Sequence, residues 1–390
     1  MMERRLLTLL AETPVHAGGP ESLAAVDLPI QREAATGLPV IWGQSLKGAL
    51  RQAWREAGLD KEVAAFGSKP PKRPTSADDS AENAAANGDQ AENSAADRNG
   101  GDARDDHGGD DDAGGPLTKG GISVGDAQLL LFPAATFRQV FGWVTTPLLL
   151  NRLGRKLRLL GADPGAAFAV SITGGFGLGV PGWEGPQVIG PFIQNIRPDE
   201  RMSVIGAALA ELVCPGEPAD PTFAFTRQKM SADLLLVEDS TMSGLAKMGT
   251  DVVARVQLAE GSKTVAHGPF YSEHLPAETV LAALLTGAEE HVERLAELLD
   301  GQAIQLGGDE TIGKGVLWCR VHSAASTAEA IGPAAAFASA AVASSAAAAP
   351  AAVVRPPAAA GPAVPTASPP VPQSPGNRPS PAVIPRRKNG

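Results

Sequence analysis

Side chains able to transfer protons or to bind a metal ion occur in two distant parts of this 390-residue sequence. Asp27 and His16 lie in an irregular segment after the first expected strand, and Glu273 lies at the end of a later strand. A carboxylate can hold a metal ion or act as a base, and a histidine can transfer protons near neutral pH. Structural roles remain open as well. Asp27 can cap a turn or pair with Arg32, His16 can be a hydrogen-bonded structural residue, and Glu273 can be a solvated strand end.

A basic helix is a second candidate, in this case for binding phosphates. Ser45 is placed to cap a helix over 46–57, and Lys47, Arg51 and Arg55 follow at intervals of four on one face. The N-terminal amides of the helix and Lys47 can take a phosphate, and the basic stripe can track an RNA backbone. The alternative is a solvated helix face whose arginines pair with Glu56.

A glycine-rich loop over 307–315 partly matches a nucleotide-binding motif. Residues 308–314 fit G-x-x-x-x-G-K, but Gly315 stands where the motif needs a serine or threonine for magnesium. An expected strand follows in place of a helix, and Asp309 and Glu310 would repel phosphates. The sequence therefore argues against nucleotide hydrolysis.

The elements that must position these residues are of mixed type. Runs of β-branched and apolar residues predict strands over 4–12, 122–131, 140–145, 234–237, 252–258, 270–285 and 316–321. Caps and helical spacing predict helices over 46–57, 147–160 and 289–299. Strands and helices interleave without regular β–α–β spacing, which favours an α+β fold over a doubly wound sheet.

Composition divides the chain into four parts. A core over 1–68 and 121–322 is interrupted by an acidic insertion over 69–120 and followed by an Ala/Pro-rich tail over 323–390, and both of these are expected to be disordered. Residues 76–113 hold twelve acidic residues against two arginines, which equals the net charge of −10 for the whole chain. The core is thus nearly balanced, and its local patches decide what it binds.

The remaining composition restricts the setting. Two cysteines are too few for a disulfide scaffold or a cysteine-rich zinc site, which favours a reducing compartment, the cytoplasm. No stretch approaches about 18 uninterrupted apolar residues, so no membrane span is expected. An aromatic content of 4% argues against RNA recognition by base stacking and favours contacts with the RNA backbone.

Three groups of segments together carry a resemblance to a known family. The first comprises 13–18 (TPVHAG), 26–33 (VDLPIQRE), 36–39 (TGLP) and 43–48 (GQSLKG). The second comprises 125–133 and 143–147, and the third 271–276 (YSEHLP) with 306–315 (LGGDETIGKG). In this order they resemble the backbone RAMP subunit of the type III-B CRISPR effector, the Cmr complex. The resemblance spans nearly the whole foldable core.

The resemblance implies a modified ferredoxin-like (RRM-like) fold, copies of which stack along a guide RNA and cut paired target RNA at regular intervals. It implies a divalent metal, Mg²⁺ or Mn²⁺, and as partners the guide and target RNAs, other RAMP subunits, the large subunit and further copies of the chain. It places the cleavage carboxylate and metal ligand at Asp27. It also implies RNA contacts at Lys47 and along the backbone of Gly313, Lys314 and Gly315.

The sequence departs from the family pattern at Ser272, where an acidic residue is common, so that Glu273 is the only carboxylate in its motif. The protruding β-hairpin thumb of the family is expected between 174 and 267. Two other functions remain open. One is an RNA-binding scaffold subunit that does not cut, and the other is a nuclease that processes precursor guide RNA alone.

Overall fold

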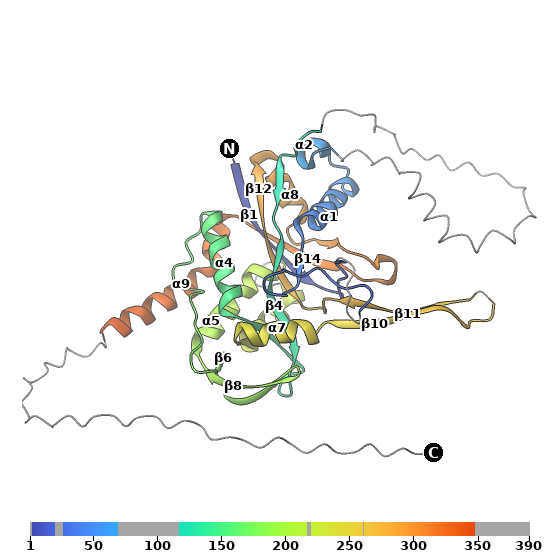
Figure 1. Ribbon diagram of the computed structural model, residues 1–390. Coiled ribbons are helices and arrows are strands. Elements are labelled where there is room, and N and C mark those ends of the chain that lie inside the picture. Colours follow the sequence, from blue (N-terminus) through green and yellow to red (C-terminus); the bar gives the residue numbers. More distant parts are fainter. Residues whose placement is uncertain (1, 20–25, 69–116, 217–219, 260, 348–390) are drawn as a thin grey trace, which may run out of the picture. The chain divides into compact units, whose positions relative to one another are not determined.

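The computed structural model describes residues 2–19, 26–68, 117–216, 220–259 and 261–347 (Figure 1). Most of the predicted acidic insertion and the end of the predicted tail lie outside these residues. In the described part, no helix is long and apolar enough to cross a membrane.

Six elements form a ferredoxin-like core. They are β1 (Met2–Ala11), α1 (Gly43–Glu56), β4 (Ala127–Ala135), β12 (Val280–Ala288), α8 (Glu289–Leu299) and β14 (Val316–His322). The four strands lie in the order β14-β1-β12-β4, and all neighbours are antiparallel. This is the β-α-β-β-α-β arrangement in which the first strand lies between the third and the fourth. The predicted α+β, ferredoxin-like fold is confirmed.

Residues 136–279 interrupt the core where a ferredoxin-like fold has only a hairpin. They extend the sheet beyond β4 in the order β5-β9-β6-β8-β7. The strands are β5 (Phe141–Thr145), β6 (Gly177–Gly179), β7 (Gly185–Ile189), β8 (Phe192–Pro198) and β9 (Leu234–Leu236). The helices are α4 (Pro147–Leu160), α5 (Glu200–Val213), η1 (Pro221–Phe223), α6 (Ala224–Ala232) and α7 (Asp239–Met248). The segment ends in a separate antiparallel hairpin of β10 (Asp251–Leu258) and β11 (Val265–His274), which extends from the sheet in Figure 1.

Short elements complete the sheet and its covering. β2 (Val40–Ile41) pairs with β4, β3 (Ile122–Val124) with β12, and β13 (Ala303–Gln305) with β14. α2 (Glu62–Phe66) follows α1, and η2 (Glu310–Ile312) lies in the glycine-rich loop. α9 (Ala324–Ala347) follows β14.

The sheet separates two hydrophobic cores, and β1 contributes to both. Leu6 and Leu10 belong to the core that contains α4 and α5, whereas Leu7 and Leu9 belong to the core formed with α1 and α8. Side chains alternate between the two faces of a strand, so the nearly continuous apolar run of β1 fits a strand buried on both faces. Thr8, which interrupts that run, is buried and donates to the Leu212 carbonyl at 2.5 Å.

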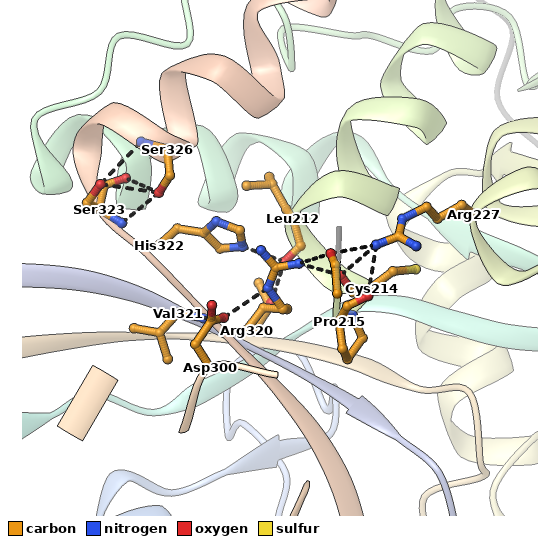
Figure 2. A network of polar contacts seen from close by, with 12 residues as sticks. Leu212, Cys214, Pro215, Arg227, Asp300, Arg320, Val321, His322, Ser323 and Ser326 are labelled. Atoms are coloured by element: carbon orange, nitrogen blue, oxygen red, sulfur yellow. Dashed lines mark hydrogen bonds and ion pairs between the residues drawn. The ribbon is translucent and has the colours of Figure 1, made fainter. Parts of the chain in front are cut away.

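Polar side chains close the C-terminal end of α5, and we call this network the α5 cap (Figure 2). Arg320 on β14 donates to the carbonyls of Cys214 at 2.6 Å and Gly216 at 3.2 Å. Arg227 on α6 donates to Pro215 and Gly216 at 2.8 and 2.9 Å. The three acceptor residues follow directly after the last residue of α5, where the carbonyls have no partner within the helix, and β14 and α6 supply the donors.

His322 completes the α5 cap. Its Nε2 lies 2.9 Å from the Leu212 carbonyl, which can only accept, so the proton of the neutral ring is on Nε2. Burial, which outweighs this hydrogen bond, lowers the pKa of His322 to about 4. Asp300 accepts from Arg320 Nε and from the Val321 amide, both at 2.9 Å.

Several expectations about local structure are wrong. The tail was expected to be unstructured from residue 323, but 324–347 form α9, because Ile331 and Ala334 find buried positions against the α4–α5 core. Residues 117–120, at the end of the predicted insertion, are not disordered, since Lys119 forms a bridge with Gly67. The first helix begins at Gly43 and Ser45 does not cap it. Its first amide donates instead to Asp126 Oδ1 at 2.7 Å.

Candidate active site

Four chain segments from three distant parts of the sequence meet beside the base of the β10–β11 hairpin. They are residues 13–19 after β1, 26–32, 271–275 at the end of β11, and 306–315 before β14, and together we call them the candidate site. Isolated bridges join Val15 to Leu275, His16 to Gly308, Gly18 to Ile30 and Leu28 to Ser272. Two of the three groups of segments that carry the family resemblance therefore form one continuous piece of structure.

Asp27 is exposed at this site and is held by the hairpin. Its Oδ2 accepts the Tyr271 amide at 2.7 Å. The neighbouring Leu28 amide donates to the Tyr271 carbonyl at 3.0 Å, and the Glu273 amide donates to the Leu28 carbonyl at 2.9 Å. The segment thus adds to β11 as a short parallel bridge. Among the described residues Asp27 has no cationic partner, so the predicted pairing with Arg32 does not occur.

His16 is half-buried and its ring is fixed by one hydrogen bond. Nδ1 lies 2.7 Å from the Glu273 carbonyl, which can only accept, so in the neutral ring Nδ1 carries the proton and Nε2 is a free base. The ring also lies 5.4 Å from that of His274, centroid to centroid. The structure therefore leaves His16 one nitrogen that can accept a proton.

Glu273 is not a solvated strand end, so that expectation is wrong, whereas its predicted role in catalysis stays a prediction. Its side chain is only 8% exposed, and it forms an ion pair with Arg32. Oε2 accepts the Ile30 amide at 3.1 Å, and Oε1 accepts the Thr250 hydroxyl at 2.7 Å. All of these contacts are internal. Ser272, where the family often has an acid, is fully buried.

A second carboxylate, Asp309, connects the glycine-rich loop to both strands of the hairpin. It pairs with Arg255 on β10, and its Oδ2 lies 2.9 Å from His274 Nε2 on β11. Burial alone would raise the pKa of Asp309, but the hydrogen bonds from Arg255 and His274 outweigh burial and hold that pKa below its ordinary value. The loop is thereby fixed to the hairpin base from the other side of the candidate site.

The glycine-rich loop depends on close backbone contacts. Gly307 has φ +93°, and a Cβ there would lie 2.4 Å from the His16 carbonyl oxygen, so only glycine fits. Of the predicted RNA contacts, Gly313 is exposed and Lys314 is half-buried, and the Lys314 ammonium has no partner among the described residues. Gly315 is buried and its amide already donates to the Pro14 carbonyl at 2.9 Å. Its backbone amide is therefore not available to RNA.

The basic residues predicted to form one stripe on α1 differ in whether a carboxylate pairs with them. Arg51 and Arg55 both pair with Glu62 of α2, not with Glu56. Hydrogen bonds from Arg55 and then Arg51 lower the pKa of Glu62 to about 2 despite its partial burial. Lys47 is half-buried and has no such partner in the described part of the chain. Ser45, beside it, accepts from Gln31 Nε2 at 2.9 Å.

The side chains near Asp27 supply too few ligands to hold a metal ion tightly. No group of three or more histidine, cysteine, aspartate or glutamate side chains able to hold a metal occurs among the described residues. Mg²⁺ usually keeps several waters and binds through one or two carboxylates plus substrate phosphates. One exposed carboxylate at Asp27 is compatible with that mode if RNA supplies further oxygens.

Asp309, Asp126 and Arg32 make structural contacts that the sequence alone does not reveal. Asp126 accepts the Gly43 amide and Arg32 pairs with Glu273, so both position segments that carry candidate residues. Arg32 and Asp126 lie within segments that carry the family resemblance, and this is the sign of their importance that the sequence offers. Their partners are 241 and 83 residues away, respectively.

Comparison with known sequences gives two findings. The sequence model of the RAMP superfamily matches residues 8–318. The chain is also 29% identical over 332 residues to the CRISPR system Cmr endoribonuclease Cmr4 of Pyrococcus furiosus. That alignment covers 80% of this chain and 94% of the relative.

Solved structures share the fold. The crystal structure of oligomeric Cmr4 from Pyrococcus furiosus superposes with a TM-score of 0.55 at 22% identity, covering 83% of this chain and all of that one. A chain in the cryo-EM structure of the type III-B Cmr-beta complex bound to cognate target RNA gives a TM-score of 0.55 at 19% identity, covering 82% and 96%. At these identities the likeness supports the architecture described above.

Proposed function

Because this chain belongs to the RAMP superfamily, we propose that it is a guide-RNA-binding backbone subunit of a type III-B CRISPR ribonucleoprotein and that it cleaves target RNA paired with the guide at regular intervals. The relative named as the Cmr endoribonuclease Cmr4, aligned over 80% of the chain, supports this assignment. Its partners would be guide RNA, target RNA, other RAMP subunits, the large subunit and further copies of itself.

The proposal rests on the exposure of the Asp27 carboxylate and on its lack of a cationic partner among the described residues. Its carboxylate is exposed, it is held by a backbone amide of the hairpin, and no cation neutralises it within the described residues. Carboxylates placed for structural reasons nearby, Glu273 and Asp309, are instead paired with arginines. Asp27 and the exposed Glu310 of the glycine-rich loop are thus the carboxylates of the candidate site without a cationic partner among the described residues, and of these two Asp27 is the one that the family resemblance assigns to cleavage.

Cleavage of RNA by in-line attack of the 2′-hydroxyl requires removal of the hydroxyl proton and stabilisation of charge on the phosphate. Asp27 can accept that proton or hold a cation near the phosphate. His16, protonated on Nδ1 by its bond to the Glu273 carbonyl, presents Nε2 as a second acceptor. Lys47 and Lys314, whose ammonium groups have no partner in the part of the chain that the structure describes, can hold neighbouring phosphates.

A divalent metal, Mg²⁺ or Mn²⁺, is part of this proposal. Asp27 would hold it, and when bound it would supply positive charge to the scissile phosphate and lower the pKa of a bound oxygen. The other ligands would come from RNA and water, since Glu273 is occupied internally.

The test is target-RNA cleavage by the reconstituted complex with Asp27→Asn, with RNA binding measured on the same samples. The amide retains an oxygen for the Tyr271 amide but loses the charge, so we expect the cleavage rate to fall about 100-fold or more with binding unchanged. Asp163→Asn, on the exposed loop after α4, is the matched control and should cut at the wild-type rate. Unchanged cleavage by Asp27→Asn would reduce the chain to an RNA-holding scaffold.

A further inference from the structure

Glu273 joins the segment that carries Asp27 to the base of the hairpin. One carboxylate oxygen, Oε2, accepts the amide of Ile30, three residues after Asp27, at 3.1 Å. The other, Oε1, accepts the hydroxyl of Thr250, the residue before β10, at 2.7 Å and pairs with Arg32. A single side chain on β11 therefore holds the Asp27 segment, the start of β10 and a guanidinium together.

Arg32 extends this connection to α7. Its Nη1 donates to the carbonyls of Gly37 and Ala246, each at 3.0 Å, while Nη2 faces Glu273. Three acceptors from three parts of the chain thus converge on one planar guanidinium. Lysine has a single donor centre and cannot reproduce this fork.

The position of Asp27 depends on the same segment. Asp27 is exposed, and the one hydrogen bond of its side chain among the described residues is from the Tyr271 amide, so the side chain follows its backbone. That backbone is tied to β11 through the two residues that follow it closely, by the bonds of Leu28 and by the bond from Ile30 to Glu273. Loss of the Glu273 carboxylate leaves the Ile30 amide without its acceptor and Arg32 without its counter-charge.

We infer that Glu273 and Arg32 are positioning residues for cleavage: their ion pair fixes segment 26–32 against the hairpin base, so that Asp27 meets the scissile phosphate in one geometry. This inference rests on the proposed function. Glu273 acts through Asp27 and not on RNA, since its side chain is 8% exposed and both oxygens are engaged. A misplacement of about 1 Å at a reacting group can lower a rate about 100-fold.

The experiment compares Glu273→Gln, Arg32→Lys and the double variant in the reconstituted complex. We measure the single-turnover cleavage rate at saturating target RNA, the dissociation constant for that RNA and the melting temperature of each protein. Each single variant should cut about 10- to 100-fold more slowly, with the dissociation constant within about twofold of wild type. The double variant should be no slower than the slower single variant, because both changes break one connection.

Asp233→Asn is the matched control for a general loss of stability. Asp233 forms a buried pair with Lys229 at 2.7 Å, away from the candidate site. This variant should lower the melting temperature yet cut at the wild-type rate once assembled. A rate loss in Asp233→Asn equal to that of Glu273→Gln would overturn the positioning role.

Asp27→Asn in the same assay separates the two hypotheses. If Asp27→Asn cuts normally, the proposed function fails. If Asp27→Asn is inactive but Glu273→Gln and Arg32→Lys cut at the wild-type rate, or if their losses multiply in the double variant, the positioning role fails alone. If Glu273→Gln is as inactive as Asp27→Asn while Arg32→Lys is unaffected, Glu273 is itself catalytic and the inference is overturned.

Discussion

The candidate site and the α5 cap are built from the same side-chain types but differ in where their polar atoms point. In the α5 cap, His322 donates to the Leu212 carbonyl in the helix, Arg320 and Arg227 donate to carbonyls just after it, and Asp300 accepts from β14 (Figure 2). In the candidate site, Glu273 and Asp309 form equivalent internal pairs. Asp27 differs because its carboxylate faces outward.

This difference shows that arginine, histidine and carboxylate groups close together are not by themselves evidence of catalysis. Buried polar groups require partners, and the α5 cap supplies donors to the carbonyls at the end of α5, although Arg227 Nε and Nη1 are themselves buried without a hydrogen-bond partner in the described part of the chain. A site for chemistry additionally needs a group left over after the internal bonds are made. The following predictions test whether the two regions separate in this way.

The largest effect is expected from pH at the α5 cap. Burial lowers the pKa of His322 to about 4 from an ordinary value of 6.5, so between these values the unfolded chain binds a proton that the folded chain does not. The free energy of unfolding therefore falls by about 3 kcal/mol in total as the pH decreases from 6.5 to about 4. Above pH 6.5 His322 is neutral in both states, and this loss is absent. Urea unfolding at several pH values, compared with His322→Gln, measures this contribution. Identical pH slopes in the two proteins would contradict it.

Removing the arginine of the α5 cap is expected to have the next largest effect. Arg320→Met retains much of the apolar stem but leaves the Cys214 and Gly216 carbonyls without this donor, and we expect a loss of about 2 kcal/mol in the free energy of unfolding. Cleavage by the assembled complex should stay within about twofold of wild type. A variant that is stable but slow would show that the two regions are coupled.

The smallest effects distinguish an unpaired cation from a paired one on α1. Lys47→Ala should weaken RNA binding and reduce the slope of log affinity against log salt by about 1, since one phosphate contact is lost. Arg55→Ala should leave that slope unchanged, because Arg55 is engaged by Glu62. Filter binding at several salt concentrations measures both slopes. Equal slopes of log affinity against log salt for the two variants would contradict the difference between Lys47 and the paired Arg55.

Much of the fold was predictable from local patterns. The helical spacing over 289–299 and the Thr146-Pro147 start gave the bounds of α8 and α4 correctly. α5 was missed because Ile205, Leu209, Ala210 and Leu212 are all buried and leave no polar face to show a helical period. α9 was missed because an Ala/Pro-rich composition is typical of disorder, and only packing onto the α4–α5 core shows its ordered part.

The candidate site was predictable as a set of segments but not as a set of roles. The motif segments around Asp27, His16 and Glu273 do meet. Whether a carboxylate faces solvent depends on partners from elsewhere in the chain. Glu273 is occupied by Arg32, which precedes it by 241 residues, and the sequence contains no local sign of that contact.

The double burial of β1 has a consequence for synthesis of the chain. β1 occupies residues 2–11, yet its two neighbours in the sheet are residues 280–288 and 316–322. An apolar strand without neighbours is a template for pairing with other chains, and such distant contacts slow folding. On the ribosome, β1 therefore waits unpaired until nearly the whole core has emerged, which makes the nascent protein a substrate for chaperones.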